Sequence, residues 1–359
     1  SDLSTAQTLT LTGTAAVNMS STTFNGNMTV SAPGFLLKNS TFNSTSSFTK
    51  TGTGNHQSDG GNVFNGAVTL ANNGTSGRIR MATVTADTYN SDATFNSTGQ
   101  DVQIAYLGNN HFAGNITINS NKVVFNTSTG KVTFTGTNNQ TLNGSYNYPF
   151  KKLAIDKPSG TVTANTTLSV DDSLIFIQGK LITTSTNLLT MKHGSTSTGA
   201  TNSSFVSGPL KKVGNTAFVF PVGKETSYLP LSISAPATTA SEFVAEYKID
   251  SLGVNTGAKD TTLGYVFRDR YWTLNRASGS SSVYVTLYWD GNYKLIDSIA
   301  TTCYWDGSKW ANLGQGTYSS TDSSGTMRTS NTISSFSEFT FAYKNIATLP
   351  SAPFSCLDI

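Results

Sequence analysis

The stretch FNGAVTL, residues 64–70, joins an Asn-Gly pair to alternating apolar and polar residues. In isolation this pattern predicts a tight β-hairpin. The same pattern recurs as FNGNMTV at Phe24, FNSTSSF at Phe42, YNSDATF at Tyr89 and FAGNITI at Phe112. The starts differ by 18, 22, 25 and 23 residues (42−24, 64−42, 89−64, 112−89). A repeat of this length predicts stacked coils of a parallel β-solenoid rather than separate hairpins.

The position of a residue in the motif predicts its orientation. Strand side chains alternate between faces, so the aromatic residue and positions five and seven, Val68 and Leu70 in the quoted stretch, are expected to point inward. Position six is expected to point outward. It forms a row of hydroxyls at Thr29, Ser47, Thr69, Thr94 and Thr117.

Positions two and three of the motif hold residues suited to the turn at a corner of the coil, because Asn and Gly tolerate positive φ at little cost. Two interpretations of the asparagines are open. They stack as a ladder of mutually bonded amides, or they serve only as corner residues. The asparagines concerned are Asn25, Asn43, Asn65 and Asn90.

The local composition and the alternating patterns of the sequence predict an all-β chain with two parts. Residues 1–203 form the β-solenoid, with clear coils in 24–118 and divergent coils in 122–203. Proline, lysine and denser aromatics then indicate a β-sandwich over 204–345, followed by a tail or linker at 346–359. In VYVTLYW the apolar side chains alternate, which places Trp289 in the core of that second part.

Composition narrows the function classes. Charged residues make up 12% of the chain, aromatic residues 11%, and the net charge is +3. No run of basic residues exceeds the pairs Lys151-Lys152 and Lys211-Lys212, which disfavours nucleic-acid binding. No apolar run approaches the roughly 20 residues that a membrane span needs. The expected partners therefore include neither nucleic acid nor a bilayer core.

The residues required for catalysis are sparse. Glycoside cleavage uses paired carboxylates, whereas residues 1–150 contain five scattered aspartates, interpreted as exposed turn residues: Asp2, Asp59, Asp87, Asp92 and Asp101. The three histidines occur singly and are interpreted as surface loop residues: His56, His111 and His193. Adjacent Asp171 and Asp172 suit a polar turn better than a calcium site. We predict no catalytic residue, no metal site, no cofactor and no enzymatic activity.

Two other features bear on binding and redox chemistry. The tetrapeptide YWDG occurs at residues 288–291 and again at 304–307. Exposed aromatic rings can stack on sugars, although a structural role is the favoured interpretation. The candidate glycan-contacting residues are Tyr288, Tyr304, Trp305 and Trp310. The two cysteines, Cys303 and Cys356, either form a disulfide or are inert free thiols.

Several stretches, in order along the chain, resemble modules of large extracellular repeat and adhesin-like surface proteins of Bacteroidota. They are TFNG coils, SGTVTANTTLSV, FVFPVGK, YLPLSI, YWTLNR, WDGSKWANLG and ISSFSEFTFA. The resemblance implies an extracellular or cell-surface location and export as type IX secretion cargo. In that group a Leu-Pro pair, here at 349–350, often precedes a sorting domain, and only SAPFSCLDI follows it in this sequence. Similarity to the group's O-glycosylation motif marks Ser173, Ser251 and Ser298.

The leading hypothesis is a structural and adhesive segment that acts as a stalk and a presenting surface. Its expected partners are flanking repeats or neighbouring copies, a cell-surface or glycan ligand, and the export machinery. The main alternative is a carbohydrate-binding module that uses the C-terminal aromatics. A polysaccharide-degrading solenoid and an ice-binding surface on the hydroxyl row are further alternatives.

Overall fold

The computed structural model describes residues 5–12, 14–250, 253–291, 293, 295–321 and 323–348. Within these residues the chain is built from β-strands and two 3₁₀ turns, η1 (Asp297–Ile299) and η2 (Ile346–Thr348), without an α-helix. The chain divides into two compact units. The first contains Ser1–Val213 with Glu225–Tyr228, and the second contains Gly214–Lys224 and the chain from Leu229.

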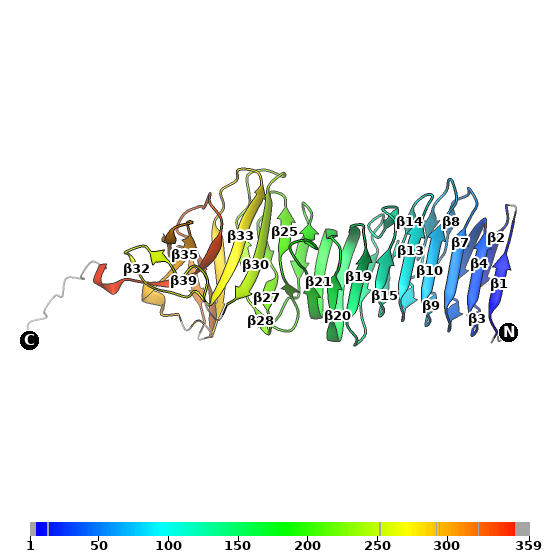
Figure 1. Ribbon diagram of the computed structural model, residues 1–359, viewed down its shortest axis with the longest axis horizontal. Helices are drawn as coiled ribbons and strands as arrows, with labels where there is room; N and C mark the ends of the chain where they lie inside the picture. Colours follow the sequence, from blue (N-terminus) through cyan, green and yellow to red (C-terminus); the bar gives the residue numbers. More distant parts are fainter. Residues whose placement is uncertain are drawn as a thin grey trace, which may run out of the picture. The chain divides into compact units, whose positions relative to one another are not determined.

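The first unit is a parallel β-solenoid in which successive coils add strands to three stacks (Figure 1). The stack that carries the motif aromatics contains β3 (Thr23–Phe24), β6 (Thr41–Phe42), β9 (Val63–Phe64), β12 (Thr88–Tyr89), β15 (Asn109–Phe112) and β18 (Lys131–Phe134). The second stack contains β1 (Gln7–Thr10), β4 (Met28–Ala32), β7 (Ser46–Lys50), β10 (Val68–Asn72), β13 (Ala93–Ser97), β16 (Ile116–Ile118) and β19 (Gln140–Gly144). The third consists of two sheets in succession, one of β2 (Ala16–Ser20) and β5 (Gly34–Lys38), and one of β8 (His56–Gln57), β11 (Ile79–Arg80), β14 (Val102–Gln103) and β17 (Val123–Val124).

The later coils keep the same parallel pairing with longer strands. Both β20 (Tyr148–Ala164) and β21 (Leu168–Ile182) run past corners, and they pair with each other in four segments separated by three register shifts. The last strands of this unit are β22 (Leu189–Met191), β23 (Thr196–Thr198), β24 (Val206–Ser207), β25 (Leu210–Val213) and β28 (Ser227–Tyr228). The predicted parallel solenoid is thus confirmed.

The register of the solenoid places each motif aromatic directly beside the next. Phe64 pairs with Phe42 on one side and with Tyr89 on the other. Ring centroids along the column from Phe24 to Phe112 are 5.1, 5.1, 5.0 and 4.4 Å apart, with nearly parallel planes. All five rings are buried. This column is the predicted inward stack.

The corner asparagines form the amide ladder. Nδ2 of Asn43 donates to Oδ1 of Asn25 at 2.5 Å, Asn65 donates to Asn43 at 2.7 Å, and Asn90 donates to Asn65 at 2.8 Å. All four side chains are exposed, so the ladder runs along the outside of the solenoid beside the buried rings. Of the two interpretations left open by the sequence, the ladder is the correct one.

The solenoid ends later than the sequence indicated. The predicted boundary near residue 204 is wrong, because β24 still pairs in parallel with β21 and β25 with β22. Pro209 lies between these two short strands, where no ladder hydrogen bond is needed from its nitrogen. The compact units divide after Val213 instead.

The second unit contains two mainly antiparallel sheets, the arrangement of a β-sandwich. One sheet is formed in spatial order by β26 (Phe218–Phe220), β29 (Leu231–Ile233), β34 (Val285–Asp290), β38 (Ser324–Arg328) and β37 (Tyr318–Ser320). The strands of the other are β30 (Glu242–Ile249), β33 (Arg270–Ser278), β39 (Glu338–Lys344), β32 (Leu263–Val266), β35 (Ala300–Trp305), β36 (Lys309–Gly314) and β31 (Ala258–Lys259), with β27 (Val222–Lys224) against β30. Only the β31–β36 pairing is parallel among the described pairs of this unit.

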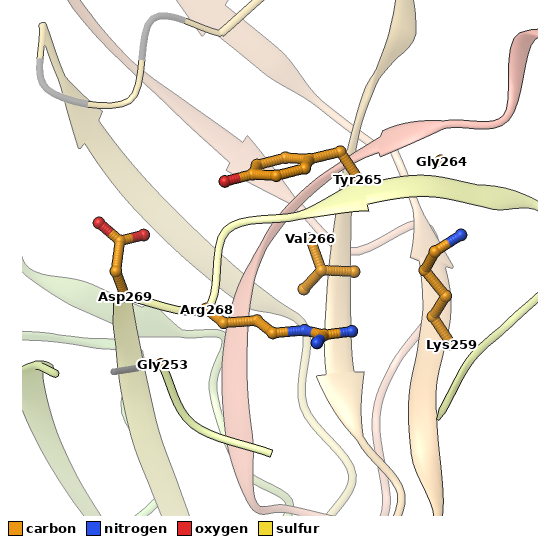
Figure 2. Close-up of a pocket in the computed structure, with 7 residues that line it drawn as sticks. All are labelled: Gly253, Lys259, Gly264, Tyr265, Val266, Arg268 and Asp269. Carbon is orange, nitrogen blue, oxygen red and sulfur yellow. The ribbon is translucent and has the colours of Figure 1, made fainter. Parts of the chain in front are cut away.

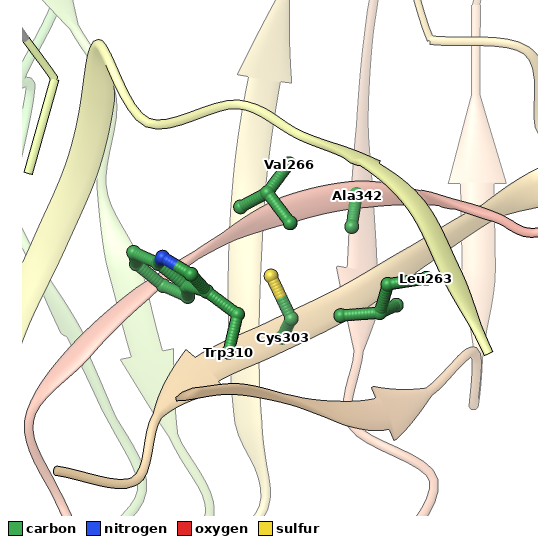
Figure 3. Close-up of a cluster of buried hydrophobic side chains, with 5 residues drawn as sticks. All are labelled: Leu263, Val266, Cys303, Trp310 and Ala342. Atoms are coloured by element: carbon green, nitrogen blue, oxygen red, sulfur yellow. The ribbon is translucent and has the colours of Figure 1, made fainter. Parts of the chain in front are cut away.

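Side chains that alternate between buried and exposed positions along the strands form the core of the second unit. Along β34 and the residues before it, Val283, Val285 and Leu287 are fully buried and Trp289 is 6% exposed, as predicted. A second cluster joins residues far apart in sequence, with the indole of Trp310 beside the thiol of Cys303 (Figure 3). The cluster consists of Leu263, Val266, Cys303, Trp310 and Ala342.

Candidate functional site

The predicted hydroxyl row lies on one outer face of the solenoid. Thr69 pairs with Ser47 on one side and Thr94 on the other, and the register continues to Thr29 and Thr117. The side chains are exposed or half-buried. Because adjacent strands lie about 4.8 Å apart, the row presents hydroxyls at that regular spacing. It is a uniform surface without a charged or catalytic group.

The inner corners of the solenoid contain buried lysines, which sequence reasoning missed. Lys50 is fully buried, and its ammonium donates to the carbonyl of Ser76 at 3.0 Å, to that of Gly77 at 3.3 Å and to that of Gly52. A signal was present, because Lys50 follows Ser46 and Phe48 at the inward positions of β7.

Two further lysines are held in the same way. Lys157 is 1% exposed and donates to the carbonyls of Thr135 and Gly136, both at 3.2 Å, and to Oε1 of Gln140 at 2.7 Å. Lys212 is 2% exposed and donates to the carbonyls of Lys192 and Ser195 at 2.8 and 2.7 Å. Burial lowers the pKa of all three ammonium groups, that of Lys212 to about 8. These lysines connect corners of the solenoid and are inaccessible to a substrate.

Asp87 is also buried, so its interpretation as an exposed turn residue is wrong. One carboxylate oxygen accepts hydrogen bonds from the backbone nitrogen and from Nδ2 of Asn62, both at 2.9 Å. The other oxygen is buried without a hydrogen-bond partner. Burial raises the pKa of this carboxyl to about 7. Among the described residues no second acid is bonded to Asp87, and the nearby acids in sequence, Asp59 and Asp92, bond to Lys38 and to Asn115.

The remaining candidate ligands do not converge. His56 lies in β8 and His111 in β15, so the loop interpretation is wrong for both, and only His193 lies in an exposed turn. Asp171 and Asp172 lie within β21 rather than in a turn; Asp171 accepts from Asn126 at 2.8 Å, and Asp172 lies 3.7 Å from the ammonium of Lys152. Among the described residues, no three His, Cys, Asp or Glu side chains gather in a group suited to a metal ion.

The four candidate glycan-contacting aromatics are not one surface. Trp310 is 0% exposed and its indole nitrogen donates to the carbonyl of Asn255 at 2.9 Å, so its prediction as a sugar contact is wrong. Trp305 is half-buried and packs against it, with ring centroids 5.9 Å apart. Tyr304 is half-buried against Phe339, and Tyr288 lies in the other sheet, on β34.

The predicted modification and thiol sites have different exposures. Ser173 in β21 is half-buried and Ser298 in η1 is exposed, while Ser251 lies outside the described residues. Cys303 is a free thiol in the core cluster, and its Sγ lies 3.6 Å from the carbonyl of Thr340. Burial raises the pKa of this thiol well above its usual range. Cys356, the other half of the proposed disulfide, lies outside the described residues.

An open hollow of about 360 Å³ in the second unit was not predicted (Figure 2). Its lining combines an exposed aromatic ring with two cations and one acid. The lining residues are Gly253, Lys259, Gly264, Tyr265, Val266, Arg268 and Asp269. Tyr265 follows the buried Leu263 by two residues in β32 but is 55% exposed, because a register shift interrupts the β32–β39 pairing between them.

No protein-family model, curated protein or solved structure matches this chain. In the part of the chain that the structure describes, no helix has the length and apolar character needed to cross a membrane.

Proposed function

We propose that this chain is a structural and adhesive segment of a secreted or cell-surface bacterial protein. In this proposal the solenoid is a spacer and the second unit presents a contact surface. The observation that carries the proposal is the uninterrupted stacking of the coils, in which the column from Phe24 to Phe112 is packed ring on ring. Such a core grows in one dimension and needs no closed globule.

The length of the solenoid supports a spacing role. Within the described residues of its second stack, nine successive pairings connect strands from β1 to β24. At about 4.8 Å for each pairing, the stack extends for about 43 Å. The buried lysines and the Asn ladder connect different coils, which opposes local opening under load.

The chemistry of the surface and the sequence resemblance support an extracellular location. The hydroxyl row carries serine and threonine and the outer corners carry the Asn ladder, and uncharged polar groups of this kind suit an extracellular surface. The similarity to Bacteroidota surface proteins supports a location at the cell surface and export by the type IX route. It also supports flanking repeats or neighbouring copies as partners. The proposal involves no catalysis and no cofactor.

Protease shaving of intact producer cells tests the location. We expect peptides from both units to be released while cytoplasmic marker proteins stay protected. Pulling single molecules of the purified chain tests the spacer role, and we expect the solenoid to resist unfolding at forces that open an ordinary unlinked loop. Recovery of the chain only from lysed cells would contradict the location, and extension without a force peak would contradict the spacer.

A further inference from the structure

The hollow on the second unit has the composition of a binding site rather than of a packing defect. In Figure 2 the ring of Tyr265 lies over Val266, with Arg268 below, Lys259 on one side and Asp269 on the other. Its volume of about 360 Å³ lies within the range of small-molecule sites, about 300–1,000 Å³. These residues come from β31, β32 and the segment between β32 and β33, so the fold assembles the site.

Neither cation of the hollow forms a described ion pair, and the ammonium of Lys259 donates to the neutral carbonyl of Leu263 at 2.5 Å. The described ion pairs of this unit join Lys248 to Glu246, Arg270 to Asp269 and Lys309 to Asp260, and none includes Lys259 or Arg268. Asp260, beside Lys259 in sequence, is bonded instead to Thr262 through Oδ1 at 2.9 and 2.8 Å. With two cations and one acid, Asp269, in the lining, the hollow carries a net charge of about +1.

Arg268 is held in place with donors to spare. Its Nη2 donates to the carbonyl of Gly257 at 3.1 Å, and its Nε is buried without a hydrogen-bond partner. A guanidinium carries five donor hydrogens in a planar fork that matches a carboxylate. Gly253, at φ +77°, packs against this side chain; a Cβ there would lie 3.2 Å from Cβ of Arg268. The glycine thus leaves room for the arginine at the edge of the hollow.

Tyr265 supplies an open aromatic face. The edge-to-face contact with Phe267, at 5.0 Å between centroids, fixes the ring, and yet 55% of the residue is exposed. An exposed aromatic face next to polar groups suits the C–H face of a sugar. The carboxylate of Asp269, 53% exposed, is available to accept hydrogen bonds from hydroxyl groups.

We propose that this hollow binds a carboxylate-bearing sugar residue, a uronic acid within an acidic polysaccharide. Tyr265 stacks on the sugar ring, Arg268 and Lys259 bind its carboxylate, and Asp269 accepts bonds from its hydroxyl groups. The proposal rests on the contact function proposed for the second unit and names the chemistry of what that surface contacts. A neutral sugar would leave both cations unpaired, and a small inorganic anion would leave the aromatic face unused.

Calorimetric titration of the purified full chain with trigalacturonate tests the proposal. We expect saturable binding that weakens as salt is raised from 50 to 500 mM, since the carboxylate contacts are screened. Tyr265→Ala and Lys259→Gln, both at exposed positions, are each expected to weaken binding at least tenfold. Tyr146→Ala, which removes another exposed tyrosine but lies in the solenoid, is the matched control and should bind like the parent.

Two comparison ligands separate the parts of the site. A neutral galactose trisaccharide tests the need for the carboxylate, and triglutamate tests the need for the sugar ring; both should bind at least tenfold more weakly than trigalacturonate. Equal binding of either ligand, absence of trigalacturonate binding, or full affinity in the correctly folded Tyr265→Ala protein would overturn the proposal. None of these outcomes bears on cell-surface shaving, so the spacer function is tested separately.

Discussion

Asp87 accepts two hydrogen bonds from Asn62, one from its backbone nitrogen and one from its Nδ2, each 2.9 Å long. The next coil continues the contact, because the backbone nitrogen of Asp87 donates to Oδ1 of Asn110 at 2.9 Å. Asp87 therefore occupies an amide position in a second, internal ladder. It is fully buried there, and no described cation pairs with its carboxyl.

The first prediction is that Asp87 makes the stability of the protein fall as pH rises from about 4 to about 7. Burial raises the pKa of the carboxyl from 3.8 to about 7, so the folded state binds more protons than the unfolded state in this interval. The stabilisation is complete below pH 4 and is lost as pH passes 7. The difference of about three pKa units corresponds to a few kcal/mol, at about 1.4 kcal/mol for each unit.

Asp87→Asn is expected to abolish this dependence and to raise the unfolding midpoint at pH 8 well above that of the parent, with a smaller gain at pH 4. Urea unfolding at a series of pH values measures the effect. The exposed Asp92→Asn is the matched control, because Asn retains the oxygen that accepts from Asn115. A gain for Asp87→Asn that is the same at every pH would contradict the buried ionisation.

A second prediction concerns the buried ammonium of Lys50. Lys50→Met keeps most of the apolar stem but removes the donor to the carbonyls of Ser76 and Gly52, while the carbonyl of Gly77 keeps its hydrogen bond from Nδ2 of Asn72. Ser76 is exposed and Gly52 is half-buried, so water replaces part of the lost bonding, and we expect a loss of about 1–3 kcal/mol. Lys38→Met removes only a half-exposed ion pair with Asp59 and should cost less than about 1 kcal/mol. Equal losses in denaturant unfolding would show that the Lys50 contacts contribute nothing.

The aromatic column leads to a third prediction. Phe64 is fully buried between Phe42 and Tyr89, so Phe64→Ala should destabilise the protein by about 3–5 kcal/mol. Thr69 in the same coil points outward, and Thr69→Ala should change stability by no more than about 0.5 kcal/mol. Calorimetric melting temperatures compare the two. Comparable losses would mean that the assigned inward and outward positions are not those of the folded protein in solution.

The solenoid was predictable because its contacts repeat with the sequence. Phe42 and Phe64 occupy the same motif position, so aligning the motifs already gave their pairing and the ladder of Asn43 and Asn65. The same alignment also indicated that the side chain of Asp87 is buried. It precedes Tyr89 by two residues, as Asn62 precedes Phe64, and alternation turns both positions inward. An interpretation by residue type, as an exposed acid, missed this signal.

The end of the solenoid and the site of the second unit were less accessible to sequence reasoning. Lys212 was part of the change in composition that predicted the end of the solenoid near residue 204. Its stem is nevertheless buried in the solenoid, and its ammonium is bonded to the carbonyl of Ser195. Trp310 is buried by residues distant in sequence, such as Leu263 and Ala342, which no local pattern reports. Tyr265 and Lys259 likewise line the same hollow only because the fold places β31 and β32 there. By contrast, the alternation of apolar and polar residues within one strand was enough to predict the burial of Trp289.

The last prediction tests the external ladder by changing one atom of Asn65. Asn65→Asp keeps the oxygen that accepts from Asn90 but replaces the Nδ2 that donates to Asn43 with a second oxygen. At neutral pH two acceptor oxygens then face each other across adjacent coils, where the parent has a 2.7 Å hydrogen bond. The repulsion should raise the pKa of the new carboxyl above that of an unfolded aspartate. Protonation in acid restores a donor to the ladder.

We therefore expect the variant to be less stable than the parent by about 1–2 kcal/mol at pH 7, since a lost hydrogen bond costs about 0.5–1.5 kcal/mol and the repulsion adds to it. The deficit should shrink below pH 4. Comparison with the parent at each pH cancels the contribution of Asp87, which both proteins share. Thr69→Asp, on the outer face of the same coil, is the control for charge alone. A deficit for Asn65→Asp that is no larger than that of the control, or that does not diminish in acid, would show that the amide ladder does not stabilise the coils.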